Sequence, residues 1–124
     1  MKKIRILVNN ISAIADLGES KTSEAIWDEL PIECRVNTWG EEIYFEIPVT
    51  SQLDSTAKEV VEKGDLGYWP TGKAFCIFFG PTPASRGDEI RPASAVNIVG
   101  KVSGNTEVLK SVQDGAAIRV ERME

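Results

Sequence analysis

Hydrophobic and polar residues alternate along most of the chain, which is the pattern of half-buried β-strands. The run from Lys3 to Val8 is the first example, and after Asn9-Asn10 the alternation resumes as far as Ile14. Asparagine tolerates the positive φ of a tight turn, so these residues predict a β-hairpin. The same reasoning predicts further strands at residues 32–37, 41–48, 66–69, 94–102 and 116–122.

Two short segments have helical features instead. In residues 19–31, side chains that can cap a helix come first, apolar residues four positions apart share one face, and a proline ends the segment. This order predicts a helix of about two turns. Asn105-Thr106 can cap a second short helix that contains Val108, Leu109 and Val112, so a helix is also predicted over 105–112. Residues 49–65 leave two structures open, a short helix over 57–63 and a strand through Val60-Val61.

The run Ala74–Phe79 is apolar on both faces, which is expected of a strand covered on both sides. About eight short strands with two short helices predict a mainly β fold, a closed eight-stranded β-barrel with the helices at its ends. A β-sandwich is the alternative closure. The connection 81–93 holds three prolines and has no periodicity, and connections of that length are usually functional or mobile.

Composition limits both the size of the protein and its chemistry. The chain has 124 residues, which predicts a single domain over 1–124. There are 19 acidic against 14 basic residues, a net charge of −5, so nucleic acid is not an expected partner. There is no histidine, which excludes catalytic triads and dyads built on imidazole and zinc sites that use it. We expect no cofactor and no metal.

The two cysteines indicate a reducing environment. Cys34 and Cys76 lie in apolar stretches and not in a metal-ligand spacing, so we expect two buried thiols. The first ten residues lack the apolar core of a secretory signal, and no apolar run is long enough to cross a bilayer. A cytoplasmic protein without a membrane partner is therefore expected.

Aromatic residues near two predicted turns are the strongest candidate for a binding surface. Trp39 and Tyr44 surround one turn, and Trp69 precedes another. Tryptophan gives a large contact area at low entropic cost, so these residues predict the floor of a groove for a peptide or small ligand. Two other roles remain open: closing the ends of the barrel, and forming a contact between subunits. The oligomeric state is left undecided.

Charged residues complete the candidate site. Arg35 lies on the polar face of its predicted strand, where it could grip a carboxylate or a peptide carbonyl. Glu42 follows across the hairpin, and Arg91 belongs to the 81–93 connection expected to cover the groove. The alternative for Arg35 is a cross-strand ion pair with Glu42 or Glu46. The predicted binding set is therefore Arg35, Trp39, Glu42, Tyr44, Trp69 and Arg91.

The second half of the chain holds three short motifs in a recognisable order. They are Gly72-Lys73-Ala74-Phe75-Cys76-Ile77, Thr82-Pro83 and Val99-Gly100-Lys101-Val102. This order resembles the second half of a cyclophilin, where a G-S-Q-F-F-I strand, a loop and F-G-K-V follow one another. Nearly the whole chain resembles a family of small uncharacterised prokaryotic cyclophilin-like proteins, through Asn37–Phe45, Gly64–Pro70 and Pro92–Asn97. The resemblance implies an eight-stranded barrel closed by two helices.

The resemblance also implies an activity to consider, peptidyl-prolyl cis-trans isomerisation. Cyclophilins use an arginine in an F-H-R-V strand, and Cys34-Arg35-Val36 can be laid on H-R-V, which would make Arg35 the catalytic residue. The proline pocket does not carry over, because Ala74, Cys76 and Val96 replace the glutamine, phenylalanine and histidine of the family pattern. A cyclophilin-like protein of unassigned activity that binds a peptide or small ligand is the expectation, and a weak isomerase is the alternative.

Overall fold

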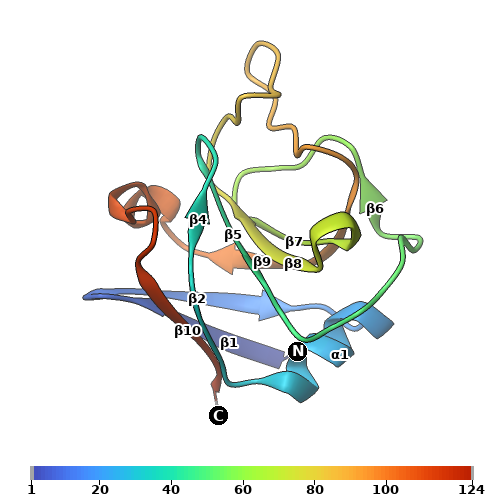
Figure 1. Cartoon of the computed structure of the whole chain (residues 1–124), viewed down its shortest axis with the longest axis vertical. Helices are drawn as coiled ribbons and strands as arrows, with labels where there is room; N and C mark the ends of the chain where they lie inside the picture. Colours follow the sequence, from blue (N-terminus) through green and yellow to red (C-terminus); the bar gives the residue numbers. More distant parts are fainter. Residues whose placement is uncertain (1, 124) are drawn as a thin grey trace.

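The structure, a computed structural model, describes residues 2–123 and is built around one antiparallel sheet of ten strands (Figure 1). The strands are β1 (Lys2–Val8), β2 (Ile11–Leu17), β3 (Ile32–Arg35), β4 (Asn37–Thr38), β5 (Glu42–Glu46), β6 (Ala57–Lys58), β7 (Asp65–Trp69), β8 (Ala74–Phe78), β9 (Val96–Ser103) and β10 (Ala117–Met123). The helical elements are α1 (Lys21–Glu29) and the 3-10 helices η1 (Pro70–Gly72) and η2 (Thr106–Ser111).

The mainly β prediction is confirmed, but the closed eight-stranded barrel is wrong. Neighbouring strands follow the order β3-β10-β1-β2-β9-β7-β8-β5-β4, with β6 beside β9, so hydrogen bonding leaves the sheet with two ends. The end strands β3 and β4 follow each other with Val36 between them. One residue cannot reverse the chain, so these strands cannot form an antiparallel pair that would close the sheet.

The strand count differs from the prediction for two local reasons. The single strand predicted over 32–37 is divided at Val36, where pairing changes from β10 on one side to β5 on the other. The segment 49–65, for which two structures were open, contains no helix. It forms the two-residue strand β6 and an isolated bridge between Val61 and Ile90.

The other predicted elements form where their local signals lie. The turn between β1 and β2 has Asn9 at a φ of 55°, which confirms the hairpin. The Ser20 hydroxyl accepts a hydrogen bond from the Ser23 N–H at 3.1 Å and begins α1. The second predicted helix is the 3-10 helix η2, where the Asn105 side chain accepts from the Glu107 N–H at 2.9 Å.

The main hydrophobic core lies on one face of the sheet. Phe45 of β5 and Phe75 of β8 stack there with ring centroids 5.4 Å apart, and both are almost fully buried. Ile26 of α1 reaches the same core and is 0% exposed. The alternation of the sequence therefore identified the residues of this face correctly.

A second, smaller core covers the opposite face of β8. Cys76 and Phe78 point to this side and meet Ile90 from the 81–93 connection and Val61 from the 49–65 segment. The Val61 N–H donates to the Ile90 carbonyl at 2.9 Å, which joins the two irregular segments into an outer layer. The sequence expectation that this strand is covered on both sides is confirmed, since every residue of β8 is buried.

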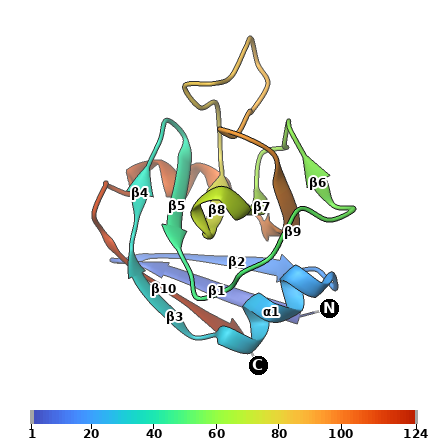
Figure 2. The same cartoon turned by 45° about the vertical axis from the view of Figure 1, so that its right-hand side comes forward.

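The 81–93 connection projects from one end of the molecule. In Figures 1 and 2 it is the gold loop at the top, at the end opposite α1 and the two termini. Its base lies close to the β4–β5 hairpin, since the Glu41 N–H donates to the Pro81 carbonyl. Ile90 of the same connection belongs to the second core, and the candidate site lies beside these contacts.

Candidate functional site

A pocket of about 290 Å³ lies beside the second core, on the outer face of the sheet. We call it the Glu42 pocket, and it is lined by Trp39, Glu42, Tyr44, Trp69, Pro92 and Ala93. The structure thus brings together the three aromatic residues and the glutamate named from the sequence. Pro92 and Ala93 were not predicted as site residues, since nothing in their own chemistry points to binding.

The β4–β5 hairpin positions one wall of the pocket. The Trp39 N–H donates to the Glu42 carbonyl at 3.0 Å, which fixes the tight end of the hairpin. Tyr44 lies two residues after Glu42 on β5, so the two side chains point to the same side of the sheet. This spacing places a carboxyl and a phenol next to each other in the pocket.

Trp69, the last residue of β7, forms the facing wall. Its indole N–H donates to the Ser94 hydroxyl at 2.6 Å, which fixes the orientation of the ring. The ring of Tyr44 meets Trp69 edge to face, with centroids 6.5 Å apart and planes at 83°. All three aromatic residues of the pocket are partly exposed, and each contributes to its lining.

The base of the 81–93 connection supplies the third wall. The Glu41 N–H donates to the Pro81 carbonyl at 2.9 Å, and the Arg91 N–H donates to the Ser85 hydroxyl at 3.1 Å. The Thr82 hydroxyl also donates to the Arg91 carbonyl. These bonds hold the two ends of the connection together and place the following Pro92 on the pocket.

Glu42 is the buried charge of the site. The residue is 5% exposed and takes part in none of the ion pairs among residues 2–123. Burial raises the pKa of its carboxyl to about 7, and the nearby Cys76 thiol partly offsets this effect. Such a carboxyl is about half ionised at neutral pH, and perturbed acids of this kind are concentrated at functional sites.

Cys76 is the titratable neighbour of Glu42 on β8. Burial, and then the negative charge of Glu42, raises the pKa of this thiol well above its ordinary value. The thiol therefore keeps its proton at neutral pH, and it donates a long hydrogen bond to the Ala74 carbonyl, at 3.8 Å. It is not a candidate nucleophile, because nucleophilic cysteines need a lowered pKa and access to solvent.

The two arginines named from the sequence lie outside the pocket. Arg35 donates from Nη1 to the Gly115 carbonyl at 2.9 Å and lines a separate shallow hollow with residues of β10. It forms no ion pair with Glu42 or Glu46 in the described part of the chain. Arg91 pairs with Glu89 at 2.9 Å and contributes to the Glu42 pocket only by preceding Pro92.

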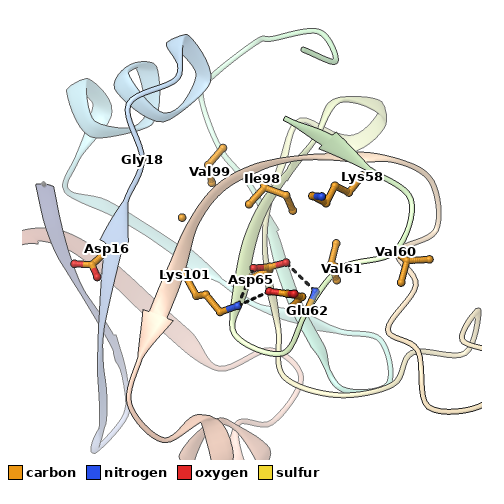
Figure 3. A pocket seen from close by; sticks show the side chains of 11 residues that line it. Asp16, Gly18, Lys58, Val60, Val61, Glu62, Asp65, Ile98, Val99 and Lys101 are labelled. Carbon is orange, nitrogen blue, oxygen red and sulfur yellow. Dashed lines mark hydrogen bonds and ion pairs between the residues drawn. The ribbon is translucent and has the colours of Figure 1, made fainter. Parts of the chain in front are cut away.

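A larger hollow of about 770 Å³ lies between β2, β9 and the 58–65 segment (Figure 3). Three of its charged side chains satisfy one another, since Lys101 lies 2.8 Å from Glu62 and 3.6 Å from Asp65. The Asp65 carboxylate also accepts from the Glu62 N–H at 2.8 Å. The hollow presents no buried charge without a partner, so we place the candidate site at the smaller Glu42 pocket.

No metal centre is evident in residues 2–123, which contain no group of three or more cysteine, aspartate or glutamate side chains placed to hold an ion. Within the same residues, no helix has the length and apolar character needed to cross a membrane.

Gly40 is expected to be essential for the pocket wall. It has a φ of +62°, and an added Cβ would lie 2.9 Å from the Pro81 carbonyl oxygen and from the Thr82 Cα. We expect Gly40→Ala to lower the free energy of unfolding by about 1–2 kcal/mol through the left-handed backbone, and by about 1–3 kcal/mol more through the clash. Urea denaturation measures the sum.

Gly87→Ala is the matched control for this substitution. Gly87 has nearly the same φ, +63°, but no atom lies within 4 Å of its added Cβ. Gly87→Ala should lower the free energy of unfolding by the backbone contribution alone. The difference between the two variants therefore isolates the contact between the β4–β5 hairpin and the 81–93 connection. Equal losses would show that this contact is not tight.

The fold and the pocket define a class of protein: a small, strongly curved antiparallel sheet with a ligand-sized pocket on its outer face. A family model described as Cyclophilin-like matches residues 2–121, and the chain belongs to this cyclophilin-like family. The family resemblance inferred from the sequence motifs is thereby confirmed.

Two solved structures are similar to the chain. The solution structure of the hypothetical protein AF2241 from Archaeoglobus fulgidus is 44% identical, with a TM-score of 0.84 over 98% of this chain and 95% of that one. The structure of McbB in complex with tryptophan is 16% identical, with a TM-score of 0.68 over 96% of this chain and 44% of that one, and shows a shared fold. No curated protein matches the chain.

Proposed function

We propose that this cyclophilin-like protein binds a small ligand, or a single side chain of a peptide, in the Glu42 pocket. The observation that carries the proposal is the glutamate itself, which is 5% exposed, unpaired by any cation in residues 2–123, and part of the lining of an accessible pocket. A buried charged group without a partner is destabilising, and proteins keep such groups chiefly where function needs them.

The size and lining of the pocket support a small occupant. Its volume of about 290 Å³ is at the lower end of the range of roughly 300–1,000 Å³ typical of small-molecule sites. Aromatic walls with one fixed polar group resemble the general composition of such sites. A longer peptide would have to lie across the rim and insert one side chain.

Tryptophan substitutions test the proposal through thermal stability. A ligand that binds only the folded protein must raise its melting temperature, so we expect a screen of small molecules to yield compounds that stabilise the wild type. Trp69→Leu removes one wall of the pocket and should lower the affinity for these compounds at least about tenfold. Trp27→Leu is the control, because Trp27 lies on α1 beneath the Arg122 guanidinium, 5.0 Å from its ring centroid.

Two outcomes would contradict binding at this pocket. One is a broad screen in which nothing stabilises the wild type. The other is a set of compounds that stabilise Trp69→Leu as well as Trp27→Leu. Sedimentation of the wild type and Trp39→Ser should accompany the screen, because a change of association state would indicate a contact between subunits instead.

Prolyl isomerisation through Arg35 is the alternative activity, and membership of the cyclophilin-like family is the observation that favours it. Isomerisation must lower a barrier of about 18–20 kcal/mol, which requires a donor beside an apolar proline pocket. Because Arg35 lies away from the Glu42 pocket, we expect no acceleration in a protease-coupled assay. Acceleration that disappears in Arg35→Ala would establish the enzyme.

A cytoplasmic location is part of the same proposal. Cys34 and Cys76 are both free thiols, and free thiols persist in reducing compartments.

A further inference from the structure

The unpaired carboxylate of the Glu42 pocket favours a cation as its occupant. An ionised carboxylate held away from water is strongly unfavourable unless an opposite charge or several hydrogen bonds accompany it. Glu42 lies beside the Cys76 thiol and has no Lys or Arg partner among residues 2–123. A ligand that carries a positive charge would supply what the protein lacks at this point.

The aromatic residues of the pocket favour the same charge. Cations are attracted to the faces of tryptophan and tyrosine rings within about 6 Å of the centroid, and more strongly where water is excluded. Tyr44 and Trp69 stand nearly perpendicular, at 83°, so they form a corner, and Trp39 lines the same pocket. One carboxylate and three aromatic rings therefore line the same pocket of about 290 Å³.

The placement of the acceptors indicates which cation fits. A primary ammonium presents three N–H donors that all need acceptors once it leaves water. The acceptor side chains of the pocket, the Glu42 carboxylate and the Tyr44 hydroxyl, both come from β5. The Trp69 indole N–H is a donor already bonded to Ser94, so N–H groups that point away from β5 would meet no side-chain acceptor. A quaternary ammonium has no N–H to satisfy, and its methyl groups can pack directly on aromatic faces.

The surroundings of Glu42 add no competing charge. Cys76 faces it from β8 as a neutral thiol, Tyr44 flanks it on β5, and Pro92 and Ala93 carry no titratable side chain. Arg91 is held by Glu89. The net charge of −5 also favours the approach of small cations over anions.

We propose that the Glu42 pocket binds a quaternary ammonium group, which presupposes the ligand-binding function put forward above. Ionised Glu42 is the countercharge, and the rings of Trp39, Tyr44 and Trp69 surround the methyl groups. The ligand class is therefore a small methylated amine, free or at the end of a flexible chain.

Choline and its neutral isostere 3,3-dimethyl-1-butanol test this directly. The two molecules have nearly the same shape and differ in the charge on the branched end. We expect isothermal titration calorimetry at pH 8.5 to show that choline binds the wild type at least about tenfold more tightly than the alcohol. In Glu42→Gln the ratio of the two affinities should fall to about one or two. Glu46→Gln, an exposed change on the same strand, should keep the wild-type ratio.

The wild type offers a second readout that needs no variant. Because the cation requires the ionised carboxylate, choline affinity should fall about tenfold for each pH unit below 7, following protonation of one group. The affinity of the alcohol should show no such slope. This comparison stands even where Glu42→Gln alters the pocket.

The outcomes separate this inference from the function on which it rests. Equal affinities for choline and the alcohol would overturn the cation and leave ligand binding at the pocket intact. A choline affinity that does not depend on pH would also overturn it. Absence of binding by both probes overturns the quaternary ammonium ligand, whereas the proposed function is decided by the screen with Trp69→Leu and Trp27→Leu.

Discussion

Replacing Glu42 with glutamine is expected to raise the free energy of unfolding by about 3 kcal/mol at pH 8.5 and to leave it nearly unchanged at pH 4.5. The folded protein raises the pKa of this carboxyl from 4.5 to about 7, and each unit corresponds to about 1.4 kcal/mol. The folded state holds the proton more tightly than the unfolded state. This contribution to stability is therefore complete below pH 4.5 and is lost as pH rises through about 7.

Urea denaturation of the wild type and Glu42→Gln at both pH values measures this effect. Glutamine keeps the shape of the side chain and cannot ionise, so the difference between the two proteins reports the ionisation of Glu42. Glu46→Gln serves as the control, because this neighbour on β5 is exposed, and its difference from the wild type should be small at both pH values. A Glu42→Gln effect of the same size at pH 4.5 and 8.5 would contradict the burial of a titrating carboxyl.

Replacing Asn97 with leucine is expected to lower the free energy of unfolding by about 3–4 kcal/mol. Asn97 is 0% exposed. Its Oδ1 accepts from the Asp54 N–H at 2.9 Å, and its Nδ2 donates to the Gln52 carbonyl at 2.9 Å. Leucine would leave the Asp54 N–H without its partner and remove the shorter of the two hydrogen bonds to the Gln52 carbonyl, and losses of this kind cost about 1–3 kcal/mol each.

The Asn97→Leu effect is checked by urea denaturation against Asn37→Leu. Asn37 is exposed and makes one long hydrogen bond, 3.4 Å, to the Tyr44 carbonyl, so its loss should stay below about 1 kcal/mol. Hydrogen exchange of the Asp54 amide should also become faster in Asn97→Leu. Similar losses in the two variants would show that the buried asparagine does not anchor the 49–56 segment.

The sequence predicted which residues share a face of each strand, but not what covers that face. The alternation over 41–48 predicts Glu42 and Tyr44 on the face opposite Ile43 and Phe45, and the structure places them there, since strand periodicity fixes this relation. The alternation gave no sign that the second core and the base of the 81–93 connection bury Glu42. Contacts between segments far apart in the chain leave no periodic signal, so the raised pKa could not be predicted.

Arg35 shows the corresponding limit for strand pairing. An unbroken strand over 32–37 would place Arg35 on the polar face of the predicted strand, and Arg35 was added to the predicted groove on that basis. In the structure the chain changes partners at Val36, because β3 pairs with β10 and β4 with β5. Arg35 is consequently turned toward Gly115. The same division explains why the sheet has two ends instead of closing as a barrel.

The ionisation of Glu42 is the property on which both the proposed function and its ligand class depend. It can be measured by following the side-chain carboxyl carbon of Glu42 by NMR as a function of pH in the ligand-free protein. The structure predicts a midpoint at about pH 7, well above its ordinary value of 4.5. A midpoint near 4.5 would show that Glu42 is solvated and would contradict the account.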